Sequence, residues 1–184
     1  MSTWSPATLH TFTTALRGGQ VCAAPAEGVY GYVADPFNLT ALQTLLESKN
    51  RAPTKGYIVL ISNLSQLSLL CPSLPEVCQS AITEHWQPRQ PATTLVLPAL
   101  PTLPSLLTGG LPTIAVRLPN PAYMQEYLAA TAQPIVSTSL NLSGQPPATM
   151  AEQLPPNIPA LTLPQPLSGT PSRIYNPQTN IFLR

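Results

Sequence analysis

The sequence is organised around the segment Ile135-Val136-Ser137-Thr138-Ser139-Leu140-Asn141-Leu142-Ser143-Gly144, in which an apolar run passes into hydroxyl and amide side chains and stops at a glycine. The run from Ile135 to Thr138 predicts a strand. The loop after it presents many small donors and acceptors, which suit phosphate or ribose oxygens. An ordinary hydroxyl-rich turn explains the same residues, so the segment alone leaves both readings open.

Strands and helices alternate on either side of this segment. Buried strands are predicted at Gln20 to Ala24, Tyr57 to Ile61, Thr93 to Leu97 and Thr113 to Leu118, with a hairpin of Ile174-Tyr175 and Ile181-Phe182-Leu183. Helices are predicted after the caps Ser5-Pro6 and Asn38, at 64–71, at 75–86, and from Pro121 to Ala130. We read Pro25 to Gly31 as a turn-rich segment and 145–171 as a loose proline-rich stretch. The alternation predicts an α/β fold with a largely covered sheet, and we expect residues 1–184 to form a single domain.

The composition excludes several classes of protein. Hydrophobic residues make up 43% of the 184 residues, which is enough for a sizeable core, while charged residues make up only 8%, against about 25% in ordinary proteins. The net charge is +1 and no basic block is present. A large nucleic-acid footprint is therefore not supported.

Targeting, metal and hydrolase motifs are missing from the sequence. No cationic segment followed by an apolar run begins the chain, and the apolar stretch from Leu95 to Leu107 is interrupted by prolines, so we expect a cytoplasmic protein without a membrane span. The three cysteines, Cys22, Cys71 and Cys78, lack zinc-site spacing, and we interpret them as core residues and predict no bound metal site. Neither a Walker loop nor a G-x-S-x-G elbow occurs.

Basic residues gather in one loop. Three of the eight in the chain fall within Lys49-Asn50-Arg51-Ala52-Pro53-Thr54-Lys55, between a predicted helix and a predicted strand. Such boundaries are where α/β sheets bind ligands, and a triphosphate needs several cationic donors. The alternative is that Lys49 and Arg51 only complement the carboxyl end of the helix.

Arg117 stands within the apolar strand Thr113 to Leu118. An arginine that faces inward there needs a partner, and a ligand carboxylate is a natural one. An arginine that faces solvent at the strand end fits the local sequence equally well.

Taken together, these segments resemble the YrdC/TsaC family of threonylcarbamoyl-AMP synthases over nearly the whole chain. The resemblance rests on Pro25-Ala26-Glu27-Gly28-Val29-Tyr30-Gly31, Lys49-Asn50-Arg51 with Lys55-Gly56, Pro91-Ala92-Thr93, Ala115-Val116-Arg117, Ser137 to Gly144, and Pro171-Ser172 with Arg184. The segment Ser137 to Gly144 is the most specific of these. The order of all six along the chain is that of the family.

The resemblance implies a twisted mixed sheet with helices on both faces around a deep cavity. It implies a nucleotidyltransferase that condenses L-threonine, bicarbonate and ATP and releases pyrophosphate, with Mg²⁺ bound to ATP. A partner transferase complex then modifies tRNA, and the near-neutral charge predicts weak or absent direct tRNA binding. By similarity, ATP is held by Lys49, Arg51, Thr93, Ser139, Asn141 and Arg184, with Lys55 as a further phosphate contact, and threonine by Arg117 and Ser172. No side chain is implied as a nucleophile; Lys49 and Arg51 position the substrates.

One departure from the family concerns the amino acid substrate. Ala26 stands where the family has a threonine that contacts the substrate threonine. This favours a second hypothesis, a non-catalytic or altered-specificity paralogue that binds nucleotide or RNA. A third is the carbamoyl-adenylate chemistry of hydrogenase maturation proteins, whose companion regions this sequence lacks.

Overall fold

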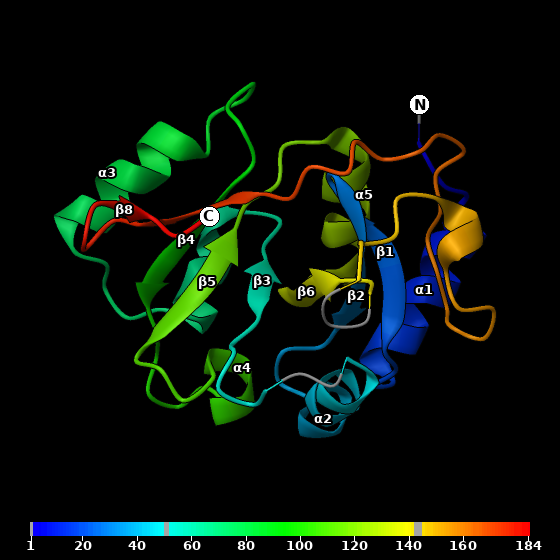
Figure 1. Cartoon of the computed structure of the whole chain (residues 1–184), viewed down its shortest axis with the longest axis horizontal. Helices are drawn as coiled ribbons and strands as arrows, with labels where there is room; N and C mark the ends of the chain where they lie inside the picture. The colour runs from blue at the N-terminus through cyan, green and yellow to red at the C-terminus, as the bar shows by residue number, and fades with distance from the viewer. Residues whose placement is uncertain (1, 50–51, 142–144) are drawn as a thin grey trace.

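All strands of the computed structural model, which describes residues 2–49, 52–141 and 145–184, lie in one sheet with the order β1-β2-β6-β3-β5-β4-β7-β8 (Figure 1). The strands are β1 (Cys22–Ala26), β2 (Val29–Ala34), β3 (Ile58–Leu60), β4 (Thr93–Pro98), β5 (Thr113–Arg117), β6 (Ile135–Ser139), β7 (Arg173–Asn176) and β8 (Ile181–Phe182). The pairs β3–β5 and β4–β7 are parallel, and the other neighbours are antiparallel. The predicted mixed sheet is confirmed.

Five α-helices surround the sheet in the part of the chain that the structure describes, and side chains cap the starts of α1 and α2. The helices are α1 (Pro6–Arg17), α2 (Leu39–Ser48), α3 (Glu76–His85), α4 (Ser105–Thr108) and α5 (Ala122–Thr131), with 3₁₀ turns η1 (Leu64–Leu69) and η2 (Ala151–Gln153). Ser5 Oγ accepts a hydrogen bond from Thr8 N at 3.1 Å, and Asn38 Oδ1 accepts one from Ala41 N at 3.0 Å. Both predicted caps are confirmed, because an oxygen at this position satisfies an N–H that has no partner within the helix.

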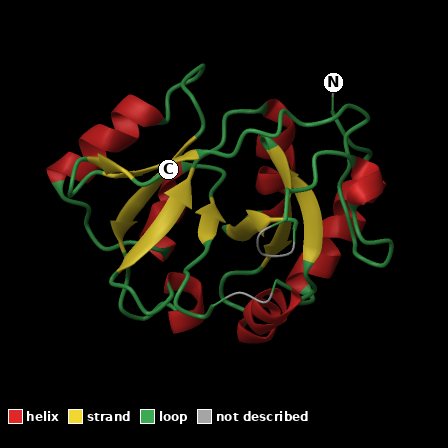
Figure 2. Ribbon diagram, viewed as in Figure 1, coloured by secondary structure: helices red, strands yellow, loops and turns green. Residues whose placement is uncertain are grey.

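Helices cover both faces of the sheet (Figure 2). Along β3, Leu60 packs with residues of α1 and α5, such as Phe12 and Tyr127, whereas its neighbours Val59 and Ile61 pack with residues of α2, α3 and α4. Successive strand residues point to opposite faces, so one short apolar strand supplies both cores. This explains why the central strand is apolar without interruption.

The β1–β2 hairpin corrects the sequence analysis, which read Pro25 to Gly31 as a turn. β1 continues through Pro25 and Ala26, the turn contains only Glu27 and Gly28, and β2 begins at Val29. Proline is tolerated here because β1 is the edge strand of the sheet. A Cβ on Gly28 would lie 1.8 Å from the carbonyl oxygen of Thr170, so only glycine allows the two segments to approach this closely.

Other differences are local. The predicted helix at 64–71 is the 3₁₀ turn η1, and the proline-rich connection before β5 contains the unpredicted short helix α4. Within the described ranges, no helix is both long and apolar enough to cross a membrane.

Candidate functional site

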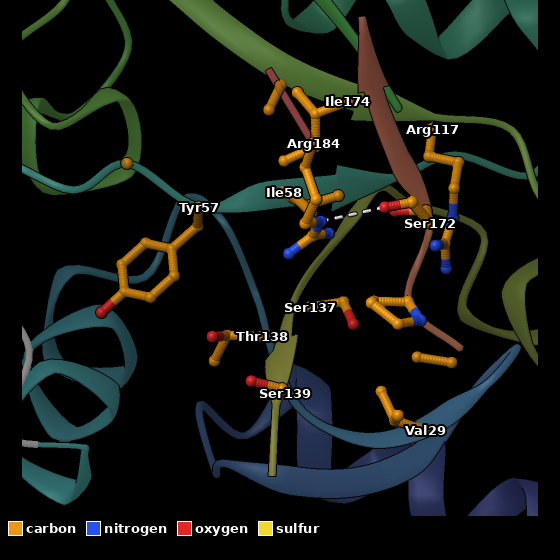
Figure 3. A pocket seen from close by; sticks show the side chains of 14 residues that line it. Val29, Tyr57, Ile58, Arg117, Ser137, Thr138, Ser139, Ser172, Ile174 and Arg184 are labelled. Atoms are coloured by element: carbon orange, nitrogen blue, oxygen red, sulfur yellow. Dashed lines mark hydrogen bonds between the residues drawn. The ribbon is translucent and has the colours of Figure 1, made fainter. Parts of the chain in front are cut away.

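A cavity of about 230 Å³ opens on the face of the sheet that α1 and α5 cover only in part. Ile58 on β3, Ala115 on β5 and Ser137 on β6 form its floor, and the strand register places them side by side. Its walls come from the start of β2, the 171–174 segment and Arg184 (Figure 3). Three strands and the carboxyl-terminal segment of the chain thus meet at one concave site, as ligand pockets of α/β sheets often do.

Lys49 and the Ser139-x-Asn141 segment form one cluster beside this cavity. The Lys49 side chain is 4% exposed, and its Nζ donates hydrogen bonds to the carbonyl oxygen of Ser139 and, at 2.9 Å each, to the carbonyl oxygen and Oδ1 of Asn141. Ser139 Oγ donates to the same Oδ1 at 2.7 Å and lines the cavity. A buried ammonium requires such partners. The structure therefore joins the two segments that the sequence analysis singled out.

Two arginines face the cavity. Arg117 is 4% exposed and its Nη1 lies 3.5 Å from Glu27 Oε2. Arg184 Nε donates to the carbonyl oxygen of Ser172 at 3.0 Å. Figure 3 shows their guanidinium groups on either side of Ser172, with Ser139 on the β6 side of the cavity.

The charge in the cavity is positive and only partly compensated. Burial lowers the pKa of Arg117, and the charge of Glu27 partly offsets this effect. Burial also lowers the pKa of Arg184, and repulsion by Arg117 adds to it. Both guanidinium groups nevertheless stay protonated, since an arginine begins from a pKa above 12. An anion placed between them would relieve the repulsion, so the cavity suits an anionic ligand.

Comparison with known proteins agrees with this geometry. The model of the Sua5/YciO/YrdC family, described as telomere recombination, matches residues 14–174. The chain belongs to this family.

Relatives of similar size support the assignment. The chain is 43% identical over 136 residues to a threonylcarbamoyl-AMP synthase of Acinetobacter baumannii, covering 72% of each chain. It is 37% identical over 169 residues to the threonylcarbamoyl-AMP synthase of Hydrogenovibrio crunogenus, covering 90% of this chain and 91% of the relative. The range that the family model matches contains all of the residues that line the cavity except Arg184.

Solved structures share the fold. P. abyssi Sua5 complexed with L-threonine superposes with a TM-score of 0.81 at 29% identity, covering 91% of this chain and 50% of that one. This chain thus spans about half the length of P. abyssi Sua5. E. coli YciO, at 19% identity and a TM-score of 0.81 over 95% of this chain, shares the fold alone.

Several site residues predicted from the family resemblance lie at the cavity: Ser139, Arg117, Ser172 and Arg184 line it. Lys49 and Asn141 lie directly behind Ser139. Lys55 is exposed and is not among the lining residues, while its neighbour Gly56 is. Arg51 lies outside the described residues.

Thr93, which the family resemblance assigns to the ATP site, has its side chain hydrogen-bonded within the protein. Its Oγ1 donates to the carbonyl oxygen of Pro91 at 2.9 Å and accepts from Arg173 Nη2 at 3.1 Å, and it is not among the residues that line the cavity. Thr94, which the sequence analysis did not single out, shares a hydrogen bond of 2.9 Å with Ser172 Oγ. Adjacent strand residues face opposite ways, so the neighbour of the motif threonine makes the contact with Ser172.

Glu27 is the other residue that the sequence analysis left without a role. It lies in the quoted Pro25 to Gly31 segment, and only the hairpin brings it to Arg117. Among the described residues, no group of three or more His, Cys, Asp or Glu side chains could hold a metal ion. Cys22, Cys71 and Cys78 are buried and free, as predicted; burial raises the pKa of Cys22 and Cys71 to about 12.

Proposed function

We propose that this protein is a threonylcarbamoyl-AMP synthase, a nucleotidyltransferase that condenses L-threonine, bicarbonate and ATP and releases pyrophosphate. The observation that carries the proposal is the pair Arg117 and Arg184, which face one cavity with hydroxyl groups opposite them. A site of this kind binds two anionic substrates side by side: the carboxylate of an amino acid and the phosphates of a nucleotide. The relatives' activity supports the same assignment.

ATP is assigned to the β6 side of the cavity. Ser139 presents its hydroxyl there, while Lys49 and Asn141 fix the backbone of the loop and add one positive charge near the phosphates. Because Lys49 already donates to three oxygens, its contribution is to charge and loop geometry more than to direct contact. Arg51, Thr93 and Arg184 belong to the same proposed nucleotide site, with Lys55 as a further phosphate contact.

Threonine is assigned to the side of Arg117 and Ser172. Arg117 offers a planar donor edge to a carboxylate, and the Ser172 hydroxyl, held by Thr94, offers a short polar contact. P. abyssi Sua5 has been seen with L-threonine bound, which supports an amino acid site in this fold.

The reaction then needs positioning more than a protein nucleophile. The amine of threonine attacks the carbon of bicarbonate, and the carbamate forms as a C–O bond breaks and the oxygen leaves as water with a proton from the amine. An oxygen of the carbamate then attacks the α-phosphate, and pyrophosphate leaves. Holding both substrates at adjacent places makes each attack effectively intramolecular. The arginines stabilise the charge that develops on the phosphate.

Mg²⁺ fits this site as a companion of ATP. Among the described residues that line the cavity none is a carboxylate, so the donor set suits phosphate oxygens better than a cation. The metal would be held by the triphosphate and its own waters, and it would neutralise part of the phosphate charge.

We also propose that the product passes to a cytoplasmic threonylcarbamoyl-transferase complex acting on tRNA. This protein itself binds tRNA weakly, since its net charge is +1.

Pyrophosphate release tests the proposal directly. Purified protein is given ATP, Mg²⁺ and bicarbonate, with and without L-threonine, and D-threonine serves as the matched control. We expect release that depends on L-threonine and on bicarbonate. Pyrophosphate release that is the same with and without L-threonine would overturn the synthase assignment. A lack of any pyrophosphate release would overturn it as well.

The alternative of a non-catalytic or altered-specificity paralogue is favoured by one observation: Ala26 lines the cavity and offers only a methyl group. Binding of ATP without threonine-dependent turnover, measured by calorimetry in the same preparation, would support this alternative.

A further inference from the structure

The turn that joins β1 to β2 contains a residue in an unfavourable backbone conformation. Glu27 has a φ of 68°, in the left-handed region where glycine is the preferred residue. A side chain with a Cβ is disfavoured there by local sterics. A non-glycine residue in this conformation beside a cavity suggests that its side chain has a function there.

Among the residues that the structure describes, the side chain of Glu27 pairs with one charged group. Its Oε2 lies 3.5 Å from Nη1 of Arg117, and the two side chains are 19% and 5% exposed. Nε of Arg117 is buried, and no described residue accepts a hydrogen bond from it. Glu27 therefore pairs with one end of the guanidinium by charge, without a hydrogen bond at Oε2, and leaves other donors, Nε among them, for a ligand.

The turn itself is held from two sides. Tyr123 and Tyr127 of α5 donate hydrogen bonds to the carbonyl oxygens of Glu27 and Pro25, at 3.2 and 3.0 Å. On the other side, the backbone N of Gly169 donates to the carbonyl oxygen of Gly28 at 2.7 Å. The carboxylate of Glu27 is thus attached to a fixed backbone, and a fixed carboxylate restricts where Arg117 points.

We propose that Glu27 is a positioning residue, which holds the Nη1 end of Arg117 so that the rest of the guanidinium faces the substrate carboxylate. This inference rests on the proposed function for the identity of that carboxylate. An arginine side chain has several rotatable bonds, and fixing it before the ligand arrives removes part of the entropy that binding would otherwise lose. The positive φ of Glu27 is consistent with a side chain whose contact with Arg117 matters more than the free-energy cost of this backbone conformation.

The variant Glu27→Gly separates this role from a structural one. Glycine relieves the backbone conformation at this position, which offsets part of the stability lost when the buried Arg117 loses its charged partner, so thermal unfolding is measured beside the kinetics. Glu27→Gln keeps the size and removes the charge. Arg89→Gly is the matched control, because Arg89 has a φ of 70°, is exposed and carries a charged side chain away from the cavity.

Two measurements decide the matter. The first is the KM for L-threonine and for ATP in the pyrophosphate assay; in both Glu27 variants the threonine KM should rise about tenfold while the ATP KM stays within about twofold. The second is the Nε–H resonance of Arg117 in nitrogen-15 NMR without substrates, which should move towards that of a solvated arginine in Glu27→Gly and stay in place in Arg89→Gly.

Each outcome has a definite meaning. An unmoved Arg117 resonance in Glu27→Gly, or a moved resonance with an unchanged threonine KM, overturns the inference. A lowered threonine KM also overturns it, because Glu27 would then compete with the substrate. Wild-type protein that neither turns over nor binds threonine refutes the proposed function instead, and the NMR comparison still reports whether Glu27 holds Arg117.

Discussion

Lys49 Nζ lies 2.9 Å from Oδ1 of Asn141, although 92 positions separate the two residues in the chain. The contact ties the end of α2 to the loop after β6. Lys49→Ala should remove the charged donor that these three oxygens share; Asn141 Oδ1 keeps its bond from Ser139 Oγ, and the lost bonds cost about 1–3 kcal/mol of unfolding free energy. It also removes one charge near the proposed phosphates, so the ATP dissociation constant should rise about tenfold or more.

Calorimetric titration with ATP and thermal unfolding check both effects, with Arg89→Ala as an exposed control. An unchanged ATP affinity in Lys49→Ala would place the nucleotide elsewhere in the molecule.

The hydroxyl pair of Thr94 and Ser172 makes a second prediction. Thr94→Val keeps the shape of the side chain and removes the hydrogen bond that holds Ser172 Oγ. The threonine KM should then rise severalfold, about as much as one neutral hydrogen bond of roughly 1 kcal/mol allows. Ser172→Ala should do the same, and the double variant should add little, because both changes remove one interaction. Additive effects of the two changes would show that they act separately.

A substitution at Ala26 should improve the binding of threonine. Ala26→Thr restores the hydroxyl that the family places at this point of the cavity. The threonine KM should fall, by up to about tenfold for one added hydrogen bond of about 1 kcal/mol. Ala26→Val adds similar bulk without the hydroxyl and is the matched control. Equal kinetics in both variants would mean that the substrate hydroxyl is bound elsewhere.

Gly28 should tolerate no side chain. A Cβ there would lie 1.8 Å from the carbonyl oxygen of Thr170, so Gly28→Ala must displace the segment that leads to Ser172. We expect a loss of roughly 1–3 kcal/mol in unfolding free energy, typical of a forced steric insertion, and a raised threonine KM. Gly18→Ala, where φ is −73° and the nearest atom would lie 3.3 Å away, should change the kinetics little. Normal kinetics in Gly28→Ala would contradict the packing of this turn.

The hydrogen bonds that the amino-terminal residues make to Glu126 should be lost in acid. Hydrogen bonds from the Ser2 hydroxyl and from the backbone N of Thr3 and Trp4 lower the pKa of Glu126 from 4.5 to about 2. A depressed carboxyl pKa stabilises the folded form above the unfolded pKa, and this contribution disappears as pH falls from about 4.5 towards 2. The backbone N–H of Thr3, which donates to Glu126 Oε2 at 2.7 Å, reports the change by NMR.

Glu126→Gln should show a shifted Thr3 amide resonance already at neutral pH and lose most of the acid response. The same pH dependence in wild type and variant would assign the effect to another carboxyl group.

Local chemistry made much of this fold predictable. The caps Ser5 and Asn38 predict the starts of α1 and α2, and the apolar run that begins at Ile135 predicts β6. Each of these signals depends only on residues that are neighbours in the sequence. β2 was missed because its strand character depends on pairing with β1 on one side and β6 on the other. No local pattern contains that information.

The sequence predicted several residues of the site, but it did not predict which partners these residues contact. The motifs identified Arg117 and Ser172, but Arg117's partner Glu27 and Ser172's partner Thr94 are determined by a hairpin turn and by strand alternation. A shift of one residue along a strand reverses the face, so Thr93 and Thr94 cannot be distinguished without the register.

The parallel pairing of β7 with β4 has a consequence for how the protein matures. Ser172 and Arg184 reach the cavity through a segment that joins the sheet by contacts with β4, some 80 positions earlier in the chain. Closing so long a loop is entropically unfavourable and tends to follow the formation of nearer contacts. During synthesis, the residues of the Lys49–Asn141 contact, which itself spans 92 positions, leave the ribosome before Ser172 and Arg184, so the wall that these two residues form is completed after the β6 side of the cavity has been synthesised.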